Sequence, residues 1–195
     1  ILHTGGTIAS KVDYRTGGVE SRFKPEEIIE MFPEIGKLAN IKSHLISNMF
    51  SEDMRFAHYK VMAEAIEKAI KDKTDGIILT HGTDTMHYTS AALAFMLEHP
   101  PIPIILVGAQ RSSDRVSSDA YSNLLATTQF ITKTDFTGVA ICMHATSEDK
   151  ESVILPATKT KKLHASRRDA FKPINAQPIA KIDPQTEKIT FIDKP

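Results

Sequence analysis

Short apolar runs that stop abruptly in polar loops recur along this chain. Residues 77–79 lead into the loop THGTDT, and residues 103–107 lead into the loop GAQRSSDR. A segment of helical character follows each loop, at about 88–97 and 119–131. Strands that alternate with helices in this way form parallel sheets with right-handed crossovers. We therefore predict an α/β fold: an open, mostly parallel sheet with helices on both faces, in a Rossmann-like three-layer arrangement.

The remaining segments fit the same plan. Apolar residues recur with a period of 3.6 over 56–71, which predicts an amphipathic helix. A turn-forming PQTE sequence between two apolar runs predicts a hairpin at 179–192. The polar segment 11–22 is expected to be a mobile surface loop or a lid over a substrate. Further strands are expected at 41–46, 138–143 and 153–155, and a helix is expected to start at 24–29.

Composition narrows the class of protein. At 195 residues the chain fits one domain, and 24 basic residues balance 24 acidic ones, so no overall charge draws it to nucleic acid or membrane. The single cysteine, Cys142, excludes an internal disulfide and favours a cytoplasmic enzyme. No apolar run reaches the roughly 18 residues that a membrane-spanning helix needs.

A second loop of the same type opens the chain. Residues 2–10 (LHTGGTIAS) repeat the order of strand end, hydroxyl side chains and small residues seen at 77–85. Two such loops on neighbouring parallel strands would bring Thr7, Thr83 and Asp84 together at the carboxyl edge of the sheet, where α/β folds place their sites. The alternative is that these threonines and this aspartate only cap helices.

The loops favour hydroxyl chemistry over two rivals. His3, His81 and His87 lack the spacing of metal ligands, so no metal is expected. The TGGT sequence has neither the length nor the lysine of a phosphate-binding loop. A threonine nucleophile needs an adjacent base, which Asp84 and a lysine from elsewhere could supply through a hydroxyl relay. Backbone N–H groups of Gly6 or Gly82 could hold an oxyanion.

These motifs resemble a known family. TGGTIA at 4–9 and HGTDT at 81–85 are similar to the two signature loops of the bacterial-type L-asparaginases and glutaminases, and VGAQR at 107–111 also fits. Within that family, SSDR at 112–115 and LHASRRDAF at 163–171 resemble the D subunits of archaeal glutamyl-tRNA(Gln) amidotransferases. The likeness covers essentially the whole chain, which would be the N-terminal α/β domain of that family.

The resemblance implies catalytic roles. Thr7 matches the family nucleophile, which forms an acyl-enzyme. Tyr14 falls in the family's mobile lid and would orient or activate Thr7. Thr83 and Asp84 match the second threonine and the acid. The catalytic lysine has three candidates, Lys159, Lys161 and Lys162; counting back nine residues from Phe171, which matches a family phenylalanine, gives Lys162.

The resemblance also implies substrate contacts. Ser51 matches the residue that binds the α-carboxylate, Asp84 would grip the α-amino group, and Gly82 belongs to the same set of substrate contacts. Glu52 departs from the glutamine familiar in asparaginases, which leaves the details of substrate contact open.

Partners follow from the same likeness. Such D subunits release ammonia from glutamine or asparagine for an E subunit, which amidates Glu on tRNA(Gln); ATP and Mg²⁺ are expected on the E subunit, and no cofactor on this chain. A homodimer is implied. The abrupt ends suggest a piece of a longer chain without the family's preceding β-barrel domain and following second α/β domain. Because that second domain completes the neighbour's site, we expect residues 1–195 alone to have little or no amidase activity.

Other interpretations remain. A free cytosolic L-asparaginase would use the same chemistry without a partner protein. A non-catalytic interaction domain could keep the fold, although it would not need Thr7, Thr83, Asp84 and Lys162 together. A nucleic-acid binder could use the basic run 159–168, although the balanced net charge argues against it.

Overall fold

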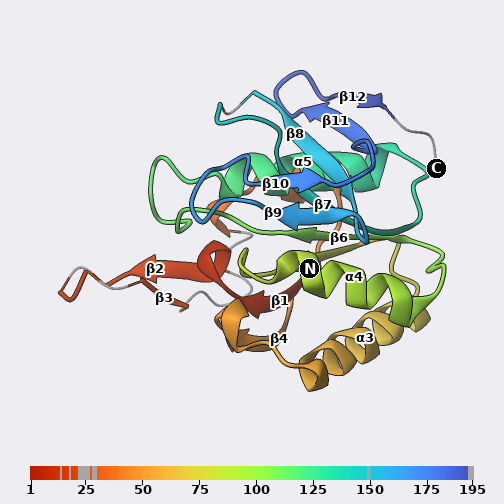
Figure 1. Ribbon diagram of the computed structural model, residues 1–195, viewed down its shortest axis with the longest axis horizontal. Coiled ribbons are helices and arrows are strands. Elements are labelled where there is room, and N and C mark those ends of the chain that lie inside the picture. The colour runs from red at the N-terminus through yellow and green to blue at the C-terminus, as the bar shows by residue number, and fades with distance from the viewer. Residues whose placement is uncertain (14, 18, 22–26, 28–29, 149, 193–195) are drawn as a thin grey trace.

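A computed structural model describes residues 1–13, 15–17, 19–21, 27, 30–148 and 150–192. Within these residues, eight strands form one sheet in the order β12-β11-β8-β7-β6-β5-β1-β4 (Figure 1). The strands are β4 (His44–Met49), β1 (Leu2–Gly5), β5 (Ile77–Thr80), β6 (Pro103–Val107), β7 (Gly138–His144), β8 (Ser152–Pro156), β11 (Ala180–Asp183) and β12 (Lys188–Phe191). The strands from β4 to β7 are parallel, and β8, β11 and β12 continue the sheet antiparallel. The predicted α/β class and mostly parallel sheet are confirmed.

Helices cover both faces of the parallel strands. The helices α3 (Phe56–Lys71) and α4 (Met86–Leu97) lie on one face, and α5 (Ala120–Lys133) lies on the other, next to the short α2 (Ile35–Leu38) (Figure 1). The helix α3 fits the predicted 56–71, and both other predicted helices run about two residues further than expected, α4 at its start and α5 at its end. The result is the three-layer arrangement that the alternation of elements predicts.

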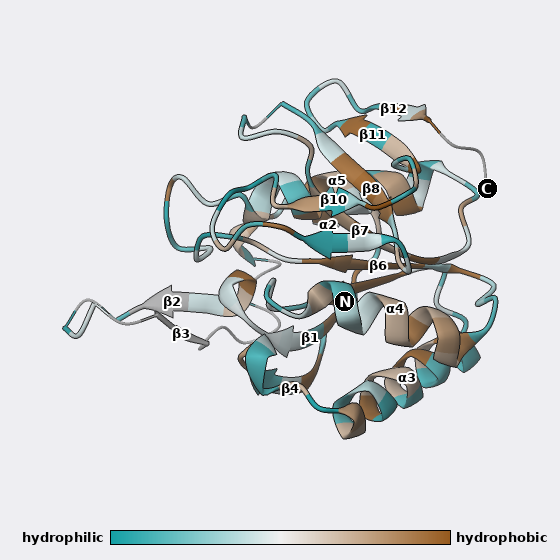
Figure 2. Cartoon of the chain, viewed as in Figure 1, coloured by the Kyte–Doolittle hydropathy of each residue, from teal (hydrophilic) through white to brown (hydrophobic). Residues whose placement is uncertain are grey.

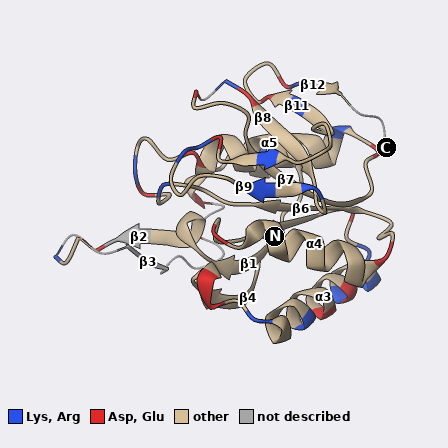
Figure 3. Cartoon of the chain, viewed as in Figure 1, with Lys and Arg blue, Asp and Glu red and all other residues tan. Residues whose placement is uncertain are grey.

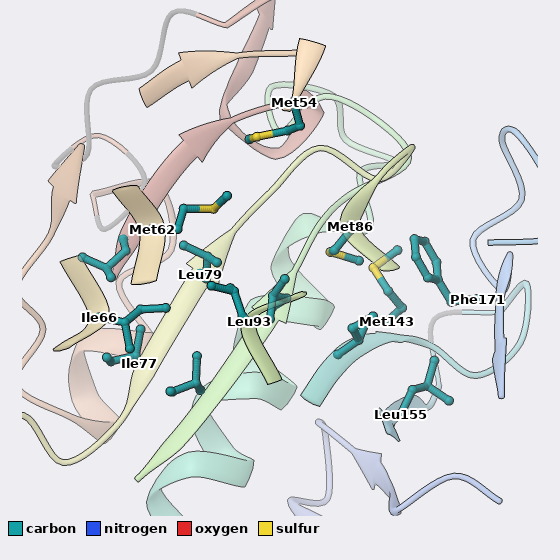
Figure 4. Close-up of a cluster of buried hydrophobic side chains, with 14 of the residues drawn as sticks. Met54, Met62, Ile66, Ile77, Leu79, Met86, Leu93, Met143, Leu155 and Phe171 are labelled. Atoms are coloured by element: carbon teal, nitrogen blue, oxygen red, sulfur yellow. The ribbon is translucent and has the colours of Figure 1, made fainter. Parts of the chain in front are cut away.

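The central strands are buried on both sides, as their unbroken apolar sequence predicts. Along β5, Ile77 and Leu79 pack against the face that carries α3 and α4, while Ile78 packs on the opposite face. Figure 4 shows Leu79 and Ile77 among side chains of both helices. Burying each such side chain contributes about 1.5–3 kcal/mol. The central strands are accordingly among the brown, apolar parts of Figure 2.

Two small antiparallel hairpins stand apart from the main sheet. The first, β2 (Ser10–Val12) with β3 (Val19–Ser21), extends away from the body of the molecule (Figure 1). Apart from Ser10 it lies within 11–22, the segment expected to be a mobile surface loop or a lid, for which the sequence did not predict strands. The second, β9 (Thr160–Lys162) with β10 (Phe171–Pro173), was not predicted, because the basic run shows no apolar alternation that would mark a strand.

Other boundaries differ from the sequence expectation. The strand expected at 41–46 is β4, three residues later, and the hairpin expected at 179–192 is confirmed as β11 and β12. Ser51 and Asp53 belong to the short 3-10 helix η2 (Ser51–Asp53), and Arg55 is the residue that precedes α3. The helix start expected at 24–29 lies outside the described residues except for Glu27.

Candidate active site

The candidate site lies where the direction of the sheet connections changes. From β1 the chain crosses to β4 on one side, whereas from β5 it crosses to β6 on the other, although β1 and β5 are neighbours. Parallel sheets leave a crevice at the carboxyl ends of two strands that part in this way. The loops that follow β1 and β5 are the two that the sequence singled out.

Two glycines bring these loops into contact. A Cβ added to Gly6 would lie 2.4 Å from Gly82 Cα and 2.4 Å from Gly82 N, so only a residue without a side chain fits there. Gly6 also has φ 78° and ψ −177°, a conformation essentially restricted to glycine. Thr7 and Thr83 each come directly after one of these glycines. The backbone contact therefore brings the two threonine-bearing loops together at the switch point.

Lys162 reaches the second loop from the β9–β10 hairpin. Its Nζ donates to Thr83 Oγ1 at 2.8 Å and to Asp84 Oδ1 at 2.9 Å. Strand alternation turns Lys162 inward, with 7% of its side chain exposed, while Lys161 points to solvent (Figure 3 shows β9 in blue). Of the lysines considered from sequence, Lys162 makes these contacts, and Lys159 is exposed.

The hairpin that carries Lys162 is anchored to α4. Ser90 Oγ, on the buried side of α4, bonds the carbonyl of Ala157 at 2.9 Å, just before β9 begins. Phe171 is fully buried beside Lys162 in the hairpin register. This anchoring explains how a residue 78 positions from Asp84 can meet it.

Ser51 forms the next wall of the site. Its Oγ is buried without a hydrogen-bond partner in the described residues, and a Cβ added to Gly82 would meet that oxygen at 2.8 Å. Thr85 Oγ1 donates to the carbonyl of Ser51 at 2.7 Å, which ties η2 to the loop after β5. An unpaired buried hydroxyl costs free energy, so a polar ligand that bonds it would recover that cost. Glu52, its neighbour, is exposed.

His81 holds the peptide group between Gly82 and Thr83 through a hydrogen bond to its carbonyl. Its Nδ1 lies 2.7 Å from Gly82 O, and because a carbonyl only accepts, Nδ1 carries the proton. Its Nε2 then accepts from the hydroxyl of Thr89 at 2.9 Å. Burial lowers the pKa of His81 to about 4, so the ring is neutral near pH 7 and serves as a hydrogen-bonding strut rather than as a base.

Some predicted site features change in the structure. The N–H of Gly6 donates to Met49 O at 3.1 Å, so the proposal that it holds an oxyanion is wrong. Tyr14 lies outside the described residues. Thr7 begins the 3-10 helix η1 (Thr7–Ala9) and is partly buried. Its neighbour Ile8 is held by Ser113, whose Oγ donates to Ile8 O at 2.6 Å.

Sequence reasoning missed Gln110. Its Oε1 accepts from Thr83 Oγ1 at 3.1 Å and its Nε2 donates to Arg167 O at 2.8 Å. The carboxylate of Asp119, the residue before α5, is fully buried and accepts from the N–H groups of Gln110 and Arg111 at 2.9–3.1 Å. The sequence offered a polar loop after the β6 strand and the family-like VGAQR motif at 107–111, and neither reveals which side chain turns inward.

Two charges of the basic run, those of Lys162 and Arg167, are paired with carboxylates. Arg167 and Lys172 both bond Asp169, at 2.9–3.2 Å, and these contacts, that of Arg167 first, hold the pKa of Asp169 below its usual range. Lys162 pairs with Asp84. In the described part of the chain, no three His, Cys, Asp or Glu side chains are grouped as a metal site would require. No described helix is both long and apolar enough to cross a membrane.

The fold and site define a class: an α/β domain with threonines on two adjoining loops and a lysine–aspartate pair beside one of them. The chain belongs to the asparaginase family, because the family model described as "Asparaginase, N-terminal" matches residues 1–195.

Within this family, the chain is similar in sequence to one group of known proteins. The chain is 48% identical over 192 residues to the D subunit of glutamyl-tRNA(Gln) amidotransferase from Methanococcus maripaludis, covering 98% of this chain and 46% of that protein. It is 49% identical over 183 residues to the corresponding D subunit from Archaeoglobus fulgidus, covering 94% and 43%. The chain thus spans about half the length of these curated relatives.

Solved structures agree on the fold. The thermostable L-asparaginase from Thermococcus kodakarensis superposes with a TM-score of 0.83 at 30% identity, over 100% of this chain and 56% of that one. The probable cytoplasmic L-asparaginase from Campylobacter jejuni gives a TM-score of 0.86 at 29% identity, over 98% and 57%.

Proposed function

We propose that this chain carries the threonine nucleophile of a tRNA-dependent amidotransferase, and that it releases ammonia from the side-chain amide of glutamine or asparagine. The observation that carries the proposal is the Lys162 ammonium bonded to both Thr83 and Asp84, on the loop that touches the Thr7 loop through Gly6 and Gly82. A scaffold has no use for a lysine with 7% of its side chain exposed that is directed at a threonine hydroxyl, since taking two charges out of water costs free energy that their pairing offsets only in part.

The chemistry proceeds in two balanced steps. The hydroxyl oxygen of Thr7 attacks the amide carbon, and its proton passes through the Thr83 hydroxyl to the leaving nitrogen, which departs as ammonia. A water molecule then adds to the Thr7 ester, releasing glutamate or aspartate and restoring the Thr7 hydroxyl. The nearby Lys162 ammonium lowers the energy of the alkoxide that forms as Thr7 attacks.

The substrate would be anchored by its two charged groups, the α-carboxylate and the α-ammonium. Ser51 Oγ, which is buried and unpaired among the described residues, would donate to the α-carboxylate. Asp84 is 60% exposed, so its second oxygen can pair with the α-ammonium while the first accepts from Lys162. The N–H of Gly82 is the remaining candidate for the oxyanion, and His81 fixes the orientation of the peptide that follows it. Glu52, next to Ser51, is exposed.

The similarity to amidotransferase D subunits supports a partner over free hydrolysis. The relatives at 48–49% identity are such D subunits, whereas the L-asparaginases are 29–30% identical. We infer that ammonia passes to an E subunit that holds ATP and Mg²⁺ and amidates Glu-tRNA(Gln), within a cytoplasmic complex built on a homodimer of the full-length chain.

Ammonia release tests the proposal. The protein in its natural full length would be assayed with L-glutamine and with L-asparagine, alone and with the E subunit, ATP and Glu-tRNA(Gln). We expect turnover that is lost in Thr7→Ala and that rises with the complete set. Thr74→Ala is the matched control, because Thr74 is exposed in the turn before β5, at the opposite end of that strand. Rapid asparagine turnover without the E subunit would favour a free L-asparaginase, and turnover that persists in Thr7→Ala would refute both.

A further inference from the structure

Thr7 lies between two neighbours that are each bonded to another segment of the chain. On one side, the N–H of Gly6 donates to the carbonyl of Met49 at 3.1 Å. On the other side, the carbonyl of Ile8 accepts from the hydroxyl of Ser113 at 2.6 Å. Ile8 is fully buried and Ser113 is 7% exposed, so this second bond lies inside the protein. The backbone is therefore anchored both before and after Thr7.

The bond from Ser113 differs from the bonds that the turn η1 makes with its own residues. The carbonyl of Gly6 accepts from the hydroxyl of Ser10 at 2.7 Å, and the carbonyl of Thr7 accepts from the N–H of Ser10. The carbonyl of Ile8 instead accepts from Ser113, which lies 105 positions away in the sequence. Because a carbonyl only accepts, the hydroxyl proton of Ser113 is directed at Ile8. Removing that hydroxyl would leave a buried carbonyl without this donor, which favours a shift of the turn.

The loop that carries Ser113 is itself fixed. The N–H of Arg111 donates to the buried carboxylate of Asp119 at 3.1 Å. The N–H of Arg115 donates to the carbonyl of Ser112 at 3.1 Å, which closes a turn around Ser113. These bonds lie on both sides of Ser113, so its hydroxyl is presented to Ile8 from a backbone that is held in place.

The anchor at Ile8 separates Thr7 from the hairpin formed by β2 and β3. That hairpin begins at Ser10 and extends away from the body of the molecule (Figure 1). Because the backbone is continuous, a change in the direction of the hairpin would reach Thr7 through Ile8 if the Ile8 carbonyl were not held. The bond from Ser113 therefore makes the position of Thr7 independent of the position of the hairpin.

We propose that Ser113 is a positioning residue for the nucleophile: its hydroxyl holds the Ile8 carbonyl and thereby keeps Thr7 where it can attack the amide carbon. This inference rests on the proposed function and adds no step to its chemistry. Ser113 acts through the backbone of Ile8. Ser51 and Asp84, which would bind the two charged groups of the substrate, lie on other segments, so Ser113 affects the attack rather than the affinity for substrate.

Exchanging a hydroxyl for a methyl group tests this role in the ammonia-release assay of the full-length protein. Ser113→Thr and Ser113→Val have side chains of nearly the same shape, but of the two only threonine can donate to Ile8. Any steric effect of the added methyl group is common to both. Thr128→Val is the matched control, because the buried hydroxyl of Thr128 donates to the carbonyl of Leu124 at 2.9 Å within α5. Thr7→Ala is measured alongside.

The expected result is a difference in kcat with little change in KM. Ser113→Val should have a kcat on the order of ten- to a hundredfold below that of Ser113→Thr, as expected when a nucleophile is misplaced by up to about 1 Å. Their KM values should agree within about threefold. Ser113→Ala, which adds no bulk, should lose as much kcat as Ser113→Val, and Thr128→Val should match wild type. Circular dichroism checks that each variant is folded under the assay conditions.

Equal kcat values for Ser113→Thr and Ser113→Val, or a difference confined to KM, would overturn the inference, while Thr7-dependent turnover would still uphold the proposed function. A loss in Thr128→Val as large as that in Ser113→Val would also overturn the inference, because the effect would then belong to any buried hydroxyl. Absence of Thr7-dependent turnover in wild type would overturn both the inference and the proposed function.

Discussion

Replacing Gly6 by alanine tests the contact that brings the two catalytic loops together. The new Cβ would lie 2.4 Å from the backbone of Gly82, and no side-chain rotation can relieve an overlap with backbone atoms. The residue would also have to keep φ 78° and ψ −177°. Either residue 6 moves away from Gly82, which separates Thr7 from Thr83, or it stays in place. If it stays, both the steric overlap and the backbone strain destabilise the folded chain.

The magnitude follows from these two costs. A non-glycine residue in this backbone region costs about 1–3 kcal/mol. Forcing a methyl group into close-packed surroundings costs typically about 1–3 kcal/mol more. We therefore expect Gly6→Ala to lower the free energy of unfolding by about 2–6 kcal/mol.

Urea unfolding of the chain, followed by circular dichroism, measures this loss. Gly17→Ala is the matched control: Gly17 also has a positive φ, 71°, but a Cβ there would meet nothing within 4 Å. We expect Gly17→Ala to cost about 1–2 kcal/mol, from backbone strain alone. If Gly6→Ala costs no more than Gly17→Ala, the loops are not held together by this glycine contact and the reasoning fails.

Two further predictions concern charge. Lys162→Met should lower kcat for ammonia release by about 10²–10³ while the fold is retained, since a charge that acts on the transition state is lost; Lys161→Met, on the exposed side of β9, should leave kcat unchanged, and equal losses would contradict the assignment. Burial lowers the pKa of His81 to about 4 from 6.5, so unfolding binds a proton below pH 6.5. The contribution of His81 to the free energy of unfolding should be fully present above pH 6.5 and should fall by roughly 3 kcal/mol as the pH is lowered to 4. Urea midpoints at pH 7 and 4.5 should therefore differ less in His81→Gln than in wild type, and an unchanged difference would contradict this origin.

The local features of the fold were predictable from sequence because they depend on neighbouring residues. The unbroken apolar run of β6 marks a strand buried on both faces, and the period of 3.6 in α3 marks a helix packed on one side. The alternation of such segments fixes parallel strands, which places the loops that contain Thr7 and Thr83 at one edge of the sheet.

Features that depend on distant residues were not predictable in the same way. The strand β9 reads as a charged run because its inward face carries Lys162, whose partner Asp84 lies 78 positions earlier in the chain. Gln110 and Asp119 resemble ordinary polar loop and cap residues, and only the folded chain shows that one contacts Thr83 and the other fixes backbone amides. Their roles arise from tertiary geometry, which local propensity does not encode.

The prediction of a β-hairpin near the end of the chain succeeded, whereas the strands in the segment after the first loop were not predicted. In the first case two apolar runs flank a turn-forming sequence, so the local signal is complete. In the second, β2 and β3 are short and polar, and they pair with each other outside the main sheet. Short polar strands carry no apolar alternation, so their sequence is indistinguishable from that of a loop.

The covalent intermediate tests the central claim most directly. Full-length protein would be mixed with L-glutamine, quenched in acid within its turnover time and digested, and the peptides would be weighed by mass spectrometry. The account predicts a glutamyl ester on the peptide that contains Thr7, located at Thr7 by fragmentation and absent from Thr7→Ala. Ammonia release from a wild-type protein that never carries this adduct, or an adduct on another residue, would contradict it.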